Sequence, residues 1–180
     1  GSDTLDLAGG TATSVIGGTG NDRVFSDAAL NTSTVTSGEG NDSLTFTAAV
    51  SSSYVEAGTG QDSLQLAAVA KSTIYGSTDS ASYISGSGII TSSSVLGASG
   101  GDTLIMLMGS GSSTIDGAGG ADSIDFNDFA SSTLLGGTGN DTLNFTGGIT
   151  AGSITGGEGT DTMAVGGTVS AASIHGGAGA

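Results

Sequence analysis

The sequence predicts an all-β fold, a parallel β-solenoid (a β-roll or β-helix) of about nine coils with about 20 residues in each coil. Three observations lead to this prediction. An aspartate recurs at a nearly constant interval, a glycine-rich segment precedes it, and apolar residues follow it at alternate positions. A fixed period of this length is typical of solenoids, in which each repeat is one structural unit stacked on the next.

The aspartate repeat runs through the whole chain of 180 residues, which we therefore treat as one domain, residues 1–180, with both ends cut within a coil. Ala81 is placed in the single gap of the series, and the coil that contains it is the fifth. We expect either a segment of a longer repeat protein or a subunit that stacks head to tail on its own copies, because solenoids normally protect their end coils. The eight aspartates are Asp3, Asp22, Asp42, Asp62, Asp102, Asp122, Asp141 and Asp161.

The composition excludes several classes of protein. The chain has 35 glycines without a single proline, which argues against collagen, and it has no cysteine for disulfide bonds. Its 17 acidic residues against two basic ones give a net charge of −15, which repels nucleic acid. No apolar run approaches the roughly 18 residues of a membrane span, so we expect no direct membrane insertion. The charge favours cations as partners.

Apolar residues at alternate positions predict two short strands in each coil. The first strand begins two residues after the aspartate position, and a second follows about thirteen residues after it. A third inward position between them is less regular, with Leu30, Val50, Ile149 and Val169. The first inward position of the first strand holds Leu5, Val24, Leu44, Leu64, Tyr83, Leu104, Ile124, Leu143 and Met163; that of the second strand holds Val15, Val35, Val55, Ile74, Val95, Ile115, Leu134, Ile154 and Ile174.

The glycine-rich turn before each aspartate carries the chemistry. Stacked coils lie about 4.8 Å apart, so equivalent aspartates form a row of like charges that repel one another. Carboxylates and main-chain carbonyls together make an all-oxygen site, which suits Ca²⁺ better than Zn²⁺ or Mg²⁺. The alternative is that each aspartate hydrogen-bonds the backbone of its turn. Eight aspartates in register favour the metal.

These turns resemble those of the repeats-in-toxin (haemolysin-type calcium-binding) family. The segments GGTGNDRVF (17–25), GGTGNDTLNF (136–145) and GGEGTDTMAV (156–165) match its pattern of glycines, aspartate and apolar residue. The resemblance implies that about six to seven Ca²⁺ ions lie between adjacent turns, held by the eight aspartates and by loop carbonyls. The implied carbonyl donors are Gly17, Thr19, Ser37, Glu39, Ala57, Thr59, Gly97, Ser99, Gly117, Gly119, Gly136, Thr138, Gly156 and Glu158.

The chain departs from that family in two respects. The family repeats every nine residues and has two calcium turns per coil, whereas this chain has one, so we expect a single column of ions along one edge. The fifth coil reads YGSTDSASYIS (75–85), with Ala81 in place of the aspartate and Asp79 in place of a loop glycine. We expect a poorer site there, or none, unless Asp79 substitutes as a ligand.

The function that we expect is structural. His175 is the single histidine, and no serine has the partners of a catalytic nucleophile, so we expect no enzymatic activity. The long one-sided repeat resembles calcium-bound regions of bacterial adhesins and surface-layer proteins, which implies a stiffened segment of an adhesin, surface layer or filament at the extracellular bacterial cell surface. Two alternatives remain open: an ice-binding solenoid, whose threonine lattice Arg23 would interrupt, and an accessory calcium module of a secreted enzyme or toxin.

Overall fold

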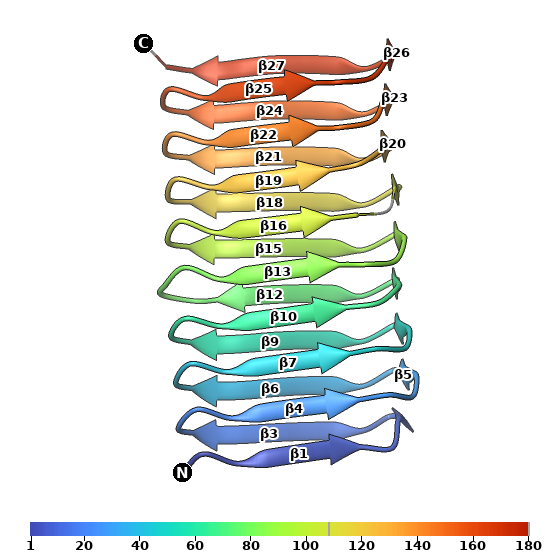
Figure 1. Ribbon diagram of the computed structural model, residues 1–180, viewed down its shortest axis with the longest axis vertical. Helices are drawn as coiled ribbons and strands as arrows, with labels where there is room; N and C mark the ends of the chain where they lie inside the picture. Colours follow the sequence, from blue (N-terminus) through green and yellow to red (C-terminus); the bar gives the residue numbers. More distant parts are fainter. Residues whose placement is uncertain (108, 180) are drawn as a thin grey trace.

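The computed structural model describes residues 1–107 and 109–179 and confirms the all-β parallel solenoid of about nine coils (Figure 1). Each coil contributes one strand to each of three parallel sheets, and the coils stack into a straight rod with the chain ends at opposite ends. Every strand pairs in register with its equivalents in the coils before and after it. No helix in the described part of the chain has the length and apolarity to cross a membrane.

The first sheet, sheet A, holds the four-residue strand that follows each aspartate position. Inward residues of this sheet alternate with outward ones, as the sequence pattern predicts. Its strands are β1 (Thr4–Leu7), β4 (Arg23–Ser26), β7 (Ser43–Phe46), β10 (Ser63–Leu66), β13 (Tyr83–Gly86), β16 (Thr103–Met106), β19 (Ser123–Phe126), β22 (Thr142–Phe145) and β25 (Thr162–Val165).

The second sheet, sheet B, consists of two-residue strands that lie along the right-hand edge in Figure 1. The sequence pattern predicted only a loose inward position here, and the structure makes it a third sheet. Its strands are β2 (Gly10–Thr11), β5 (Leu30–Asn31), β8 (Val50–Ser51), β11 (Val69–Ala70), β14 (Ile90–Thr91), β17 (Ser110–Gly111), β20 (Phe129–Ala130), β23 (Ile149–Thr150) and β26 (Val169–Ser170).

The third sheet, sheet C, contains the strand that leads into each glycine-rich turn. The chain enters it from sheet B through one residue of left-handed backbone in each coil, with φ between 48° and 56°. Its strands are β3 (Ser14–Thr19), β6 (Thr34–Glu39), β9 (Tyr54–Thr59), β12 (Thr73–Ser77), β15 (Ser94–Ser99), β18 (Thr114–Gly119), β21 (Thr133–Thr138), β24 (Ser153–Glu158) and β27 (Ser173–Ala178).

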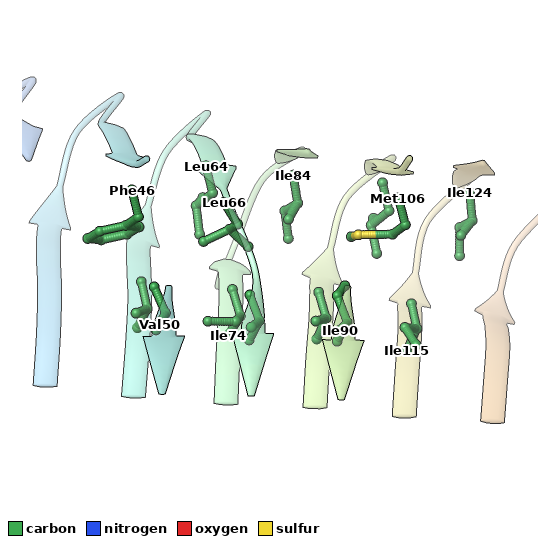
Figure 2. Close-up of a cluster of buried hydrophobic side chains, with 14 of the residues drawn as sticks. Phe46, Val50, Leu64, Leu66, Ile74, Ile84, Ile90, Met106, Ile115 and Ile124 are labelled. Carbon is green, nitrogen blue, oxygen red and sulfur yellow. The ribbon is translucent and has the colours of Figure 1, made fainter. Parts of the chain in front are cut away.

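The core is a thin column of aliphatic and aromatic side chains between the three sheets. Figure 2 shows side chains such as Leu64, Ile84 and Ile124 pointing toward Ile74 and Ile115 from the opposite side. Phe126, Phe129 and Phe145 form a cluster in the later coils, with ring centroids 5.1–6.0 Å apart. The predicted inward residues are buried through most of the rod, whereas Val169 and Ile174 in the last coil are exposed.

The register of the fifth coil corrects the sequence-based alignment. Ser63 pairs with Tyr83 and Leu64 pairs with Ile84, so the inward apolar residue of this coil is Ile84. Ile84 is fully buried, whereas Tyr83, which the spacing placed inward, is 40 % exposed. The residue that precedes β13 at the aspartate position is therefore Ser82, and Ala81 lies one residue earlier. This placement restores a spacing of 20 residues on both sides of the coil.

A ladder of buried serines joins the coils where sheet B turns into sheet C. The main-chain N–H of each serine except the last donates to the Oγ of the serine one coil later, at 3.0–3.3 Å. Each Oγ also donates to the carbonyl two residues before it, at 2.7–3.1 Å. Both roles of the hydroxyl are thus satisfied inside the rod. The members of this serine ladder are Ser33, Ser53, Ser72, Ser93, Ser113 and Ser132.

Ser110 is a buried serine outside this ladder, and it provides a test of the packing argument. It occupies the inward position of sheet B between Ile90 and Phe129, and its Oγ is buried without a hydrogen-bond partner. A buried hydroxyl without a partner costs about 1–3 kcal/mol. We predict that Ser110→Ala raises the free energy of unfolding by about 1 kcal/mol in urea titrations.

The matched control is Ser113→Ala, three residues away in the serine ladder. Because the Ser113 hydroxyl both donates to the Gly111 carbonyl and accepts the Ser93 N–H, its loss should lower the free energy of unfolding by about 1–3 kcal/mol. Destabilisation of similar size by both substitutions would contradict the prediction.

Candidate functional site

The predicted aspartate column lies along the edge where the turns of the rod join sheet C to sheet A, at the left in Figure 1. Each aspartate directly precedes the first residue of a sheet A strand, so in-register pairing of those strands places the aspartates one above another. Six of the eight are 1–3 % exposed: Asp22, Asp42, Asp62, Asp102, Asp122 and Asp141. Asp161 is half-buried and Asp3 is exposed, as expected near the ends of the stack.

One carboxylate oxygen of each aspartate after Asp3 joins two coils. The main-chain N–H of Asp22 donates to Oδ1 of Asp42 at 2.7 Å, and that of Asp42 donates to Oδ1 of Asp62 at 2.8 Å. The same bond recurs in the other half of the rod, at 2.7–3.0 Å. We call this row the aspartate ladder. The turn-capping alternative expected each aspartate to bond the backbone of its own turn, whereas the bonds observed go to the backbone of the preceding coil.

The second carboxylate oxygen has no hydrogen-bond partner. Oδ2 is buried without one in Asp22, Asp42, Asp62, Asp102, Asp122, Asp141 and Asp161. This feature distinguishes the aspartate ladder from the serine ladder, which joins coils through the same kind of N–H bond and leaves no polar atom of its own unpaired. A buried charged oxygen without a partner is strongly unfavourable.

Five of the seven unpaired oxygens lie, together with a main-chain carbonyl oxygen, beside a glycine. A methyl group placed on Gly97 would come within 3.0 Å of both Asp102 Oδ2 and the carbonyl oxygen of Gly117, closer than side chains pack. The same pair of oxygens, one carboxylate and one carbonyl of the following coil, lies beside Gly17, Gly117, Gly136 and Gly156. These glycines form what we call the glycine column. It holds Ser37 and Ala57 in the third and fourth turns, and Ser37 Oγ donates to the Ala57 carbonyl.

The structure separates the predicted carbonyl donors into two groups. Carbonyls of the glycine column, such as those of Gly117, Gly136 and Gly156, lie beside the unpaired Oδ2 atoms. Four of the seven predicted carbonyls two residues further along the turn accept an N–H from the preceding coil: Glu39 from Gly20, Thr59 from Gly40, Thr138 from Gly120 and Glu158 from Gly139, at 2.7–2.9 Å. The first group is therefore better placed to act together with the carboxylates.

Burial raises the pKa of four of the ladder aspartates. It raises the pKa of Asp62 to about 7, that of Asp102 to about 6 and that of Asp122 to about 7. It also raises the pKa of Asp141. The N–H of the neighbouring coil lowers each pKa and offsets only part of the effect of burial. The ladder therefore holds charges that the protein interior disfavours and that a proton or a cation would neutralise.

The donor atoms fit a hard cation. Carboxylate and carbonyl oxygens are the ligands of Ca²⁺, which takes six to eight of them in flexible geometry. Within the described residues, no three acidic, histidine or cysteine side chains gather at one point. Ligands beyond the carboxylates of adjacent coils would therefore come from main-chain carbonyls, as the resemblance to the calcium-binding repeats implies.

The serine ladder is the part of the polar interior that sequence reasoning missed. Its signal was a serine ten or eleven residues after an aspartate of the repeat, which holds for five of its members, as in Ser33 and Ser53 after Asp22 and Asp42. That signal was hidden within segments such as TSSSVL (91–96), where several serines compete for the same role. Only the register of the strands shows which serine of each run points inward.

Scanned against protein-family models, curated proteins and solved structures, the chain gives no match. The resemblance to the calcium-binding repeats thus depends on the motif and on the geometry described above.

The raised pKa values predict how stability depends on pH in calcium-free buffer. In the folded chain Asp62, Asp102, Asp122 and Asp141 bind protons more tightly than in the unfolded chain, where the pKa of an aspartate is near 3.9. Their contribution to stability is therefore complete below about pH 4 and is lost as the pH rises through the folded-state values of about 6 and 7. We expect the Tm to fall by more than about 5 °C between pH 5 and pH 8, as measured by circular dichroism. A Tm that rises over this range would contradict the assignment.

Proposed function

We propose that this chain is a calcium-stiffened structural rod, a segment of a secreted bacterial surface protein such as an adhesin, a surface layer or a filament. The observation that carries the proposal is the row of buried Oδ2 atoms without hydrogen-bond partners. The serine ladder supports it by contrast, because a neutral hydroxyl joins coils equally well. A carboxylate in the same structural role adds a charge that coil stacking does not need.

Electrostatics supports a cation over an empty ladder. Neighbouring carboxylates about 4.8 Å apart repel by roughly 3 kcal/mol for each adjacent pair at an effective dielectric constant of 20. One divalent ion between two rungs converts this repulsion into attraction for both. Protonation relieves it as well, but near neutral pH the carboxyl groups lose their protons and a cation binds in their place.

Calcium is the divalent ion that the donor set favours. Carboxylates combined with main-chain carbonyls give an irregular shell of oxygens, which Ca²⁺ accepts, whereas Mg²⁺ demands near-ideal octahedral geometry and retains its water. Zn²⁺ prefers sulfur and nitrogen ligands, and the chain contains no cysteine and a single histidine. About six to seven ions would nearly balance the net charge of −15.

The extracellular location follows from the proposed metal. Sites built from few carboxylates and many carbonyls bind at calcium concentrations typical of the outside of the cell. Because an ion that binds only the folded chain stabilises it, calcium would favour folding after export.

The outer face of sheet A supports ice binding less well than the calcium proposal, because its outward columns lack a regular row of hydroxyl groups. The outward column next to the aspartates in sheet A reads Thr4, Arg23, Ser43, Ser63, Tyr83 and Thr103 over the first six coils. Arg23 and Tyr83 both interrupt the hydroxyl row, and the column beside it begins with Asp6, Phe25 and Thr45.

The isosteric substitution Asp122→Asn tests the proposal through two effects of opposite sign. Asparagine keeps an Oδ1 acceptor for the Asp102 N–H and removes the buried charge. At pH 8 without calcium, we expect the Tm of this variant to exceed that of the unsubstituted chain by about 3 °C or more. With millimolar Ca²⁺, the Tm gain of the variant should be smaller than that of the unsubstituted chain, because two adjacent rung pairs lose a ligand charge.

Asp27→Asn is the matched control, since it removes the same charge from an exposed position away from the ladder. It should leave both the calcium-free Tm and the gain with Ca²⁺ near those of the unsubstituted chain. The readout is thermal unfolding by circular dichroism in chelator, in Ca²⁺ and in Mg²⁺. An unsubstituted chain whose Tm is indifferent to Ca²⁺ would rule out the proposal.

A further inference from the structure

The aspartate ladder contains one neutral rung, Ser82. This residue is 4 % exposed and occupies the aspartate position of the fifth coil, and its N–H donates to Asp102 Oδ1 at 2.6 Å, as the N–H of an aspartate does elsewhere. Its Oγ lies beside Gly76 and the Gly97 carbonyl, where other coils place a carboxylate oxygen. Ser82 thus keeps the position and the main-chain donor of a ladder aspartate, but its side chain carries no charge and accepts the N–H of Ser77 in its own turn.

The turn of this coil is closed by its own side chains. Ser82 Oγ accepts the N–H of Ser77, and Ser77 Oγ accepts the N–H groups of Asp79 and Ser80 at 3.3 and 3.1 Å. The exposed Asp79 accepts the Gly60 N–H through Oδ1 at 2.9 Å, where the turns of other coils supply a main-chain carbonyl. Asp79 therefore replaces a carbonyl of the turn on its outer side, and it does not restore the missing buried carboxylate.

We infer that Ser82 divides the ion column into two separate calcium clusters. One cluster belongs to Asp3, Asp22, Asp42 and Asp62, and the other belongs to Asp102, Asp122, Asp141 and Asp161. The inference rests on the proposed calcium function and specifies which parts of the column bind. Ser82 is thereby the residue that sets the number and the coupling of the ions.

The spacing of the rungs explains the division. A calcium ion holds oxygens at about 2.3–2.6 Å, so it can bridge two carboxylate oxygens that are at most about 5 Å apart. Adjacent rungs at about 4.8 Å meet this limit. Asp62 and Asp102 are separated by two coils, or roughly 9.6 Å, so no single ion reaches both. Ions within a cluster share carboxylates and influence one another, whereas ions across Ser82 share none.

The experiment is isothermal titration calorimetry of the full chain with CaCl₂ after removal of bound metal, for the unsubstituted chain, Ser82→Asp and Ala81→Asp. Ser82→Asp completes the ladder and creates two new pairs of adjacent carboxylates, so we expect about two more Ca²⁺ ions bound per chain. Without calcium at pH 8, the same variant should melt at a lower temperature than the unsubstituted chain, because the row of buried charges is longer. Ala81→Asp adds the same charge one residue away, and its stoichiometry should not change.

Asp122→Ser provides a second test in case Ser82→Asp does not fold. It should introduce a second neutral rung and lower the stoichiometry by about two ions, and serine is already accommodated at this position in the fifth coil. Equal stoichiometry for the unsubstituted chain, Ser82→Asp and Asp122→Ser would overturn the inference while leaving the calcium proposal intact. An unsubstituted chain that binds no Ca²⁺ would overturn both.

Discussion

In-register stacking of the coils is the constraint on which the rest of this structure depends. All three sheets pair each strand with its equivalent one coil away, so every position of the repeat becomes a column of side chains. A residue in the interior is therefore surrounded chiefly by copies of its own position. Apolar columns gain from this arrangement because like side chains nest on one another, and the coils together bury a core that no single coil could form.

A column of polar side chains is stable inside the rod only where the stacked coils supply its hydrogen-bond partners. The serine hydroxyl meets this condition fully, because it accepts from the coil before it and donates within its own corner. The aspartate meets half of it, since Oδ1 accepts the neighbouring N–H and Oδ2 has no donor. Two columns with the same relation to the backbone thus differ by one unpaired charged oxygen per coil. This difference distinguishes the glycine-rich edge from the rest of the polar interior.

The sequence was sufficient to predict the number of coils, the single column of aspartates and most inward apolar positions, because each of these features repeats with a fixed period. The prediction was wrong in the fifth coil, where the aspartate is missing and the turn is one residue longer, with seven residues from Gly76 to Ser82 against six from Gly17 to Asp22. Beyond Gly76, the glycines that mark the other turns are missing, so the sequence alone did not decide whether Ala81 or Ser82 occupies the aspartate position. The pairing of Tyr83 with Ser63 and Thr103 shows that it is Ser82. Sheet B was not predicted because strands of two residues, such as Val50–Ser51, are too short to show alternation.

The same stacking explains why one uncharged residue in the aspartate row has a large effect on the repulsion between its neighbours. Repulsion along a row of equal charges accumulates from neighbours on both sides, so a middle rung contributes more than an end rung, where solvent also screens the charge. Ser82 occupies the centre of the row, and Asp3, at its beginning, is exposed. The main-chain N–H of Ser82 donates to Asp102 Oδ1 as the N–H of an aspartate does elsewhere, and the serine side chain leaves the centre of the row without a charge. The backbone therefore stacks without interruption from one end of the rod to the other. The two groups of carboxylates, in contrast, are separated by two coil spacings, which weakens the repulsion between them.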